Sequence, residues 1–212
     1  MSASAIHLVR HGEVFNPTGV LYGRIEGFGL SELGTRMAAK SAESFAGRDV
    51  RRIVASPLQR TRESAAPWST GFGLDVDIDE RIIEPWNRFE GTKVRFGPGV
   101  LGKPEVWQWV RNPFLPSWGE PYVEIANRMM AAIDEAYESV DGGEVVLVSH
   151  QLPIWMVHRH LAAERLYHDP RRRRCSLSSI TSLTKRDGTF VETGYSNPAA
   201  SLAIAATDTG AV

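Results

Sequence analysis

The side chains best suited to bind a phosphate follow three short apolar runs of the sequence. Arg10 and His11 come directly after the first run, Arg60 lies just beyond the second, and His150 directly follows the third. Arginine binds phosphate oxygens with two parallel N–H groups, and a neutral histidine can attack phosphorus. If these four side chains meet, they form a site for a dianionic group such as a phosphate.

Each of these side chains also has an ordinary structural interpretation. An arginine and a histidine after a strand can form a turn or an edge ion pair, and Arg60 alone could be a solvated helix residue. His150 alone could be a core histidine that donates to a backbone carbonyl. A metal site is the chemical alternative, but an arginine beside each histidine would repel a cation, so we expect no metal.

The position of the four side chains depends on strands that the sequence predicts. Four apolar runs of strand length, rich in β-branched residues, are residues 5–9, 52–56, 74–78 and 144–149. Helical patterns lie between them, which predicts an α/β fold with a mainly parallel central sheet and helices on both faces. The carboxyl ends of parallel strands bind ligands, so the four side chains are expected to lie close together.

Helix signals add to this picture. Apolar spacing predicts helices from Leu33, with Ser31 as N-cap, and over about 120–140. Ser56-Pro57 is typical of an N-cap followed by a proline in the first helical position, and a further helix is expected after His150. The N-termini of these last two helices would favour an anion beside the candidate side chains.

The remaining segments define the boundaries of the domain. Asp187-Gly188 between two apolar runs predicts a hairpin, and therefore a C-terminal antiparallel edge. No repeat or long linker divides the chain, so we expect a single domain over 1–198, with the Gly-, Pro- and Trp-rich 86–118 as a lid or insertion and 199–212 as a frayed tail.

Composition excludes several classes of protein. The 212 residues, 42 % hydrophobic and 23 % charged, are typical of one soluble globular domain, and the net charge of -1 favours neither nucleic acid nor an anionic membrane. The lone Cys175 excludes an internal disulfide. No export signal or membrane span is visible, so we expect a cytoplasmic protein, and a homo-oligomer is compatible with the sequence.

Three motifs in order carry a resemblance to a known family. LVRHGE (8–13), SPLQRTRESA (56–65) and VVLVSH (145–150) resemble the histidine phosphatase superfamily, in its phosphoglycerate mutase-like branch, over nearly the whole chain. The resemblance implies an α/β sandwich, a phosphohistidine intermediate and no metal or other cofactor.

The resemblance also assigns roles to residues. His11 matches the nucleophile, and Arg10, Arg60 and His150 match the phosphate pocket. Glu84, which ends Ile82-Ile83-Glu84, matches the proton donor, with Glu80 and Glu90 as rivals.

Further phosphate- or substrate-binding candidates are Asn16, Gly23 and Gln151. Asn16 stands five residues after His11 where the family usually places an asparagine six after, and Gln151 replaces a usual glycine. These departures concern the substrate pocket more than the core chemistry.

The sequence therefore predicts a metal-independent phosphomonoester hydrolase that acts on a small phosphorylated metabolite through a phosphohistidine. A phosphoglycerate mutase-type isomerase and a non-catalytic phosphate-binding module are the alternatives. The four arginines Arg171–Arg174 predict a solvated basic loop. If the helix after His150 continues to Pro170, this loop lies at the far end of the sheet and does not touch a small substrate.

Overall fold

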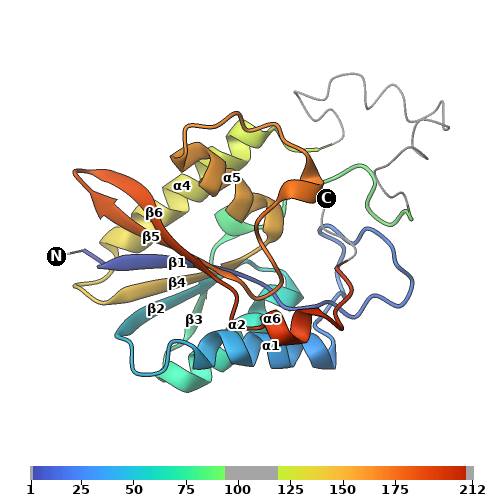
Figure 1. The fold of residues 1–212 in the computed structure, drawn as a ribbon, viewed down its shortest axis with the longest axis horizontal. Helices are drawn as coiled ribbons and strands as arrows, with labels where there is room; N and C mark the ends of the chain where they lie inside the picture. The colour runs from blue at the N-terminus through green and yellow to red at the C-terminus, as the bar shows by residue number, and fades with distance from the viewer. Residues whose placement is uncertain (1, 94–118, 209–212) are drawn as a thin grey trace.

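The computed structural model describes residues 2–93 and 119–208 and confirms the α/β fold (Figure 1). Six strands of the described residues form one sheet in the order β3-β2-β4-β1-β5-β6. They are β1 (Ala5–Arg10), β2 (Val50–Ala55), β3 (Val76–Ile78), β4 (Glu144–Ser149), β5 (Ile180–Arg186) and β6 (Thr189–Ser196). The first four are parallel neighbours, and β5 and β6 are antiparallel, as the sequence predicts.

Helices cover both faces of this sheet. The helices α4 (Tyr122–Glu138) and α5 (Gln151–Leu161) lie on one face, and α1 (Glu32–Glu43), α2 (Gln59–Phe72) and α6 (Ala200–Ala203) lie on the other (Figure 1). Two short 3-10 helices, η1 (Glu80–Ile82) and η3 (Pro170–Arg172), lie in connections. No helix in the described part of the chain has both the length and the apolar character that a bilayer span needs.

The central strand β4 shows how the two hydrophobic cores form. Val145 and Leu147 pack into the cluster beneath α4 and α5, whereas Val146 and Val148 pack into the cluster on the α1 and α2 side. Side chains alternate along a strand, and here both faces are covered, so the strand is apolar throughout. Because β4 is buried on both faces, its carboxyl end, which leads to His150, has a fixed position.

Of the two predicted serine N-caps, one is confirmed and the other is wrong. Ser31 caps α1, because its Oγ accepts a hydrogen bond of 2.9 Å from the Gly34 amide. Ser56 does not cap α2, which begins at Gln59 with Leu58 in the N-cap position and no side-chain cap. The Ser56 hydroxyl instead lies 2.7 Å from the His150 Nε2, so a tertiary contact replaces the local cap.

The predicted hairpin is confirmed. Asp187 and Gly188 join β5 to β6 with φ angles of 49° and 79°. Two consecutive positive φ angles match the twist of the strands that they connect.

The C-terminal tail differs from the frayed segment that the sequence predicts. The helix α6 forms there, and Ala199 and Leu202 pack with Met37 of α1 and with Leu177. Residues 209–212 and most of the expected lid at 86–118, namely 94–118, lie outside the described residues.

The predicted position of Arg171–Arg174 at the far end of the sheet is wrong. The helix α5 ends at Leu161 rather than at Pro170, and Ala163 turns the chain with a φ of 53°. The eleven residues of α5 span about 16 Å. The eight residues 162–169 are long enough to lead the chain back over this distance. Arg173 therefore comes back to the start of α5, where its Nη1 donates to the Gln151 Oε1 at 3.3 Å.

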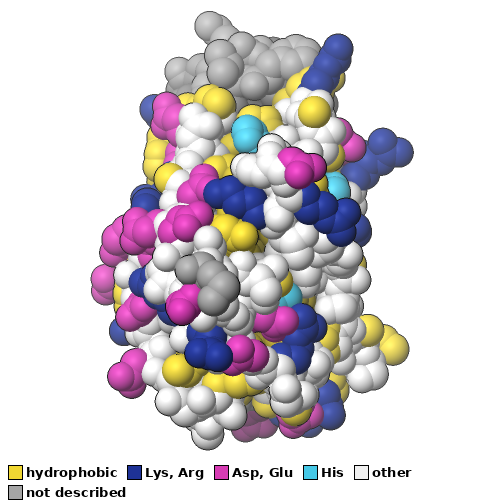
Figure 2. Space-filling view, turned by 90° about the vertical axis from the view of Figure 1, so that its left-hand side faces the viewer, with side chains coloured by type: hydrophobic (Ala, Val, Ile, Leu, Met, Phe, Trp, Pro, Cys, Tyr) yellow, Lys and Arg dark blue, Asp and Glu magenta, His cyan; other side chains and the backbone are white. Residues whose placement is uncertain are grey.

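Charges of both signs lie at the amino ends of the parallel strands, opposite the strand ends that carry the candidate residues. Figure 2 shows side chains of both signs there, with acidic ones gathered mainly toward the left of the view and basic ones scattered across it. At the amino ends of the parallel strands, Arg48 pairs with Glu144 at 2.7 Å and Arg51 pairs with Asp49 at 2.6 Å.

A close backbone contact between α1 and the residues after β1 generates a prediction. A Cβ added to Gly34 would lie 2.0 Å from the Glu13 carbonyl oxygen, so something must move. We expect Gly34→Ala to lower the free energy of unfolding by about 1–3 kcal/mol, measured by urea denaturation. The control Gly71→Ala, in α2 with nothing within 4 Å of the added Cβ, should raise it by up to about 1 kcal/mol. Equal changes in the free energy of unfolding in the two variants would show that the contact with Glu13 does not restrict residue 34.

Candidate active site

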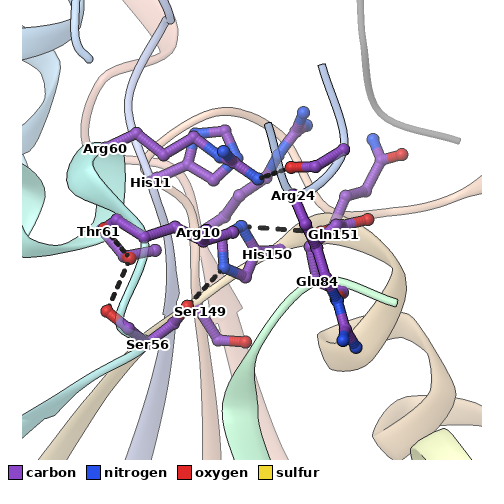
Figure 3. A network of polar contacts seen from close by, with 12 residues as sticks. Arg10, His11, Arg24, Ser56, Arg60, Thr61, Glu84, Ser149, His150 and Gln151 are labelled. Atoms are coloured by element: carbon purple, nitrogen blue, oxygen red, sulfur yellow. Dashed lines mark hydrogen bonds and ion pairs between the residues drawn. The ribbon is translucent and has the colours of Figure 1, made fainter. Parts of the chain in front are cut away.

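The ends of β1 and β4 and the start of α2 bring Arg10, His11, Arg60 and His150 together (Figure 3). The backbone N–H of His11 donates to the Ser149 carbonyl at 3.1 Å, which extends the β1–β4 pairing by one residue. The ring centroids of His11 and His150 lie 5.2 Å apart. The expected convergence at the carboxyl edge of the sheet is therefore present.

His11 has a fixed tautomer. Its Nδ1 lies 2.7 Å from the Gly12 carbonyl oxygen, which can only accept, so Nδ1 carries the proton and Nε2 has a free lone pair. Burial, and then the charges of Arg60 and Arg10, hold the pKa of His11 well below its usual value of 6.5. The ring is therefore neutral near pH 7, as a nucleophile must be.

Arg60 is held by the loop after β1. Its Nη2 donates to the Gly23 carbonyl at 2.8 Å, and its guanidinium lies 4.8 Å from the centroid of the Tyr22 ring. Gly23 has a φ of 40°, and a Cβ there would lie 2.2 Å from the Glu90 Oε1. The backbone of Gly23 thus orients Arg60, and a side chain at Gly23 would disturb this arrangement.

His150 connects two parts of the site. Its Nε2 lies 2.7 Å from the Ser56 hydroxyl, and its Nδ1 lies 3.5 Å from the Glu84 Oε2. Burial, followed by the charge of Arg60, lowers the pKa of His150 well below 6.5. Each ring nitrogen therefore faces a polar group, and the ring is uncharged until an anion favours its protonation.

Glu84 is a buried carboxyl just after η1. It is 3 % exposed, and burial raises its pKa above the usual 4.5, although Arg60 and Arg173 act in the opposite direction. The Ser149 Oγ donates to the Ile82 carbonyl at 2.7 Å, and the Arg24 Nε donates to the carbonyl of Glu84 at 2.6 Å. These two bonds hold the backbone on either side of the carboxyl.

The rival carboxylates have other surroundings. Glu80 is exposed on η1. The Oε1 of Glu90 accepts from the Asn87 amide at 3.1 Å and lies against Gly23. Among the three candidates, Glu84 alone makes the close contact with His150.

Four buried polar atoms find no hydrogen-bond partner among the described residues and belong to the candidate site. They are the Nε atoms of Arg10 and Arg60, the Nδ1 of His150 and the Oε1 of Glu84. Because buried polar groups are normally hydrogen-bonded, such a cluster indicates a place for a polar ligand. Guanidinium donors suit an anion, and the described residues contain no group of three or more His, Cys, Asp or Glu side chains able to hold a metal ion.

The other predicted binding residues have protein partners. The Asn16 side chain bonds to Val20 within its own loop, through Nδ2 at 2.8 Å and Oδ1 at 3.3 Å. The Gln151 Nε2 donates to the Cys175 carbonyl at 3.4 Å. Asn16 therefore stabilises a turn, whereas Gln151 lies at the start of α5.

Sequence reasoning missed Arg24 and Arg173. Burial lowers the pKa of Arg173 to about 10, and Glu84 and Tyr122 are among the groups that act on it. No glycine or proline between Leu161 and Asp169 marks the end of α5, so no local signal placed Arg173 here. Arg24 lies outside the three motifs, and its contact with the Glu84 carbonyl depends on tertiary structure.

Comparisons with known proteins agree with this geometry. The family model of the histidine phosphatase superfamily (branch 1) matches residues 6–198. An uncharacterized protein of Mycobacterium tuberculosis is 52 % identical over 195 residues, which cover 92 % of this chain and 96 % of that protein. A probable phosphoglycerate mutase of Yersinia pestis is 28 % identical over 192 residues, with 82 % and 83 % covered.

A solved structure shares the fold. The mycobacterial glucosyl-3-phosphoglycerate phosphatase superposes with a TM-score of 0.70 at 22 % identity, over 90 % of this chain and 97 % of that chain.

Arg60 generates a prediction about anion binding. Arg60→Met should weaken the binding of inorganic phosphate, measured by calorimetry, because a hydrogen bond to a charged group contributes about 1.5–3 kcal/mol, or roughly tenfold or more in Kd. Arg62→Met, the exposed arginine two residues along the same helix, is the matched control and should bind as the wild type does. Equal losses in both variants would place the anion elsewhere.

Proposed function

The chain belongs to the histidine phosphatase superfamily, and from this premise we propose that it is a phosphomonoesterase acting on a small phosphorylated metabolite. The observation that carries the proposal is the state of His11, a neutral imidazole with a free Nε2 beside two buried arginines. A binding module needs the arginines, but it has no need of a nucleophile with a fixed tautomer.

In the first step, the Nε2 lone pair of His11 attacks phosphorus and forms a nitrogen–phosphorus bond. The bond from phosphorus to the ester oxygen breaks, and Glu84 gives that oxygen its proton. Arg10, Arg60 and His150 meet the charge on the three equatorial oxygens. Burial supports the role of Glu84, because it raises the pKa of the carboxyl and so keeps a larger fraction protonated.

In the second step, water attacks the phosphohistidine. The Glu84 carboxylate now takes a proton from that water, the nitrogen–phosphorus bond breaks, and the electron pair returns to the His11 Nε2. Inorganic phosphate leaves, and both residues regain their initial protonation states. The division replaces one difficult displacement by two easier ones.

Neither step uses a metal ion. The cationic donor set at the site suits phosphate oxygens directly, since Arg10 and Arg60 supply the charge that a metal would otherwise provide.

Isomerisation is the second candidate, and the relative described as a probable phosphoglycerate mutase favours it. The two reactions share the first step and differ in whether water or the retained product attacks the phosphohistidine. The phosphatase with the shared fold favours hydrolysis. Release of free phosphate from a monophosphate, without formation of an isomer, separates the two.

The phosphohistidine is open to a direct test. Acid-labile, base-stable label should appear on the wild-type protein after rapid quenching with a labelled phosphoester, with chelator present throughout. His11→Asn should carry no label, whereas the control His160→Asn, an exposed histidine at the end of α5, should be labelled normally. Normal labelling of His11→Asn would show that another residue is the nucleophile.

Glu84 should set one limb of the pH profile. A general acid must be protonated, so kcat is expected to fall as the pH rises through the raised pKa of Glu84. In Glu84→Gln this limb should disappear, and esters with poor leaving groups should react about 10²–10⁴ slower than with the wild type, while activated esters change less.

Glu80→Gln and Glu90→Gln are the matched controls and should keep both the limb and the rate. If either of them shows the leaving-group dependence instead, Glu84 is not the acid.

A further inference from the structure

The C-terminal tail contacts the candidate site through Asp208. Its carboxylate makes two hydrogen bonds with the guanidinium of Arg10, from Nη1 to Oδ2 at 2.8 Å and from Nη2 to Oδ1 at 2.5 Å. Arg10 is fully buried, whereas the Asp208 side chain is 39 % exposed. A bidentate pair of this kind fixes both the distance and the plane of the guanidinium.

The geometry of the pair leaves part of Arg10 available. A guanidinium can bind an oxyanion along the edge formed by its two Nη atoms or along the edge formed by Nε and Nη2. Asp208 occupies the first edge, and the Cys175 carbonyl accepts a further bond from Nη1 at 2.7 Å. The Nε, on the second edge, has no hydrogen-bond partner among the described residues.

A second contact anchors the tail beside Asp208. The backbone N–H of Thr207 donates to the Glu13 Oε1 at 2.6 Å, and the other oxygen of Glu13 accepts from the Ser31 Oγ at 2.5 Å. Glu13 belongs to the same motif as Arg10 and His11 but has no part in the proposed reaction. The motif thus supplies two attachment points for the last described residues of the chain.

The pair also maintains the charge of Arg10. Burial alone would lower the pKa of this guanidinium, but the Asp208 carboxylate raises it above its usual value. Arg60 bonds to the Gly23 carbonyl and His11 to the Gly12 carbonyl, which are both uncharged partners. Asp208 therefore offsets part of the positive charge gathered at the end of the sheet.

We propose that Asp208 is a positioning residue of the phosphate pocket, which holds the Nη1–Nη2 edge of Arg10 so that the Nε–Nη2 edge faces the transferred phosphoryl group. The inference rests on the proposed function. The same contact could instead make the carboxylate a competitor of phosphate, and that alternative predicts changes of opposite sign.

The test uses the full chain with substitutions at Asp208. Asp208→Ala should raise the Kd for inorganic phosphate and lower kcat/KM by about tenfold to a hundredfold, as expected when a catalytic donor is misplaced. Asp208→Asn should act in the same direction, because its amide NH₂ cannot accept from Arg10. Asp208→Glu, which keeps the carboxylate, should restore part of both quantities.

The matched control is Asp75→Ala, an exposed carboxylate just before β3 at the opposite end of the sheet, which should change neither quantity. Thermal unfolding of each variant shows that the fold is retained, and Asp208→Asn gives the same comparison if Asp208→Ala does not fold.

Two outcomes would overturn the inference. Tighter phosphate binding or a higher kcat/KM in Asp208→Ala would show that the carboxylate competes with phosphate. Unchanged values would show that the pair only attaches the tail. Failure of the proposed function looks different, because the wild type would then form no phosphohistidine and release no phosphate.

Discussion

Two buried guanidinium groups at the end of a parallel sheet are the constraint around which this site is built. Arg10 is 0 % and Arg60 1 % exposed. A buried charge without partners costs several kcal/mol, so the surrounding chain must compensate each one. Cys175 and Asp208 do this for Arg10, while the Gly23 carbonyl does it for Arg60. Segments far apart in the sequence are thereby drawn to one point.

The same burial sets the protonation states of the neighbours. The desolvation that lowers the pKa of His11 and His150 raises the pKa of Glu84, because burial disfavours whichever form is charged. The arginines add to the effect on the histidines and oppose it on the carboxyl. One environment therefore favours the unprotonated form of the two histidines and the protonated form of the carboxyl within a small volume.

The sequence predicted those features that depend on local patterns. Runs such as EVVLVS indicate buried parallel strands because both of their faces are covered, and Asp187-Gly188 indicates a hairpin because both residues tolerate a positive φ. The convergence of Arg10, His11 and His150 followed from the topology of such sheets. The roles given to these residues rest on the family pattern and stay predictions.

Tertiary contacts explain where sequence reasoning was wrong. The Ser56 hydroxyl has two possible uses, as a helix cap or as a partner for His150, and only the fold decides between them. The end of α5 has no glycine or proline to mark it, so the return of Arg173 was not visible. Ser56 and His150 are 94 residues apart in the chain, and Arg173 and Gln151 are 22 apart, yet each pair is in direct contact in space.

In-line displacement explains why the motifs predict the reaction better than they predict the substrate. If His11 attacks one side of phosphorus, the leaving oxygen departs from the other, where Glu84 must reach it. Glu84 is contacted by Arg24, whose Nε bonds to the Glu84 carbonyl and whose Nη2 lies 3.4 Å from Glu120. Arg128 bonds to the same carboxylate at 2.7 Å. Under the proposed mechanism, the organic part of a substrate would therefore meet segments outside the three motifs, whose side chains can differ without any change in the chemistry at phosphorus.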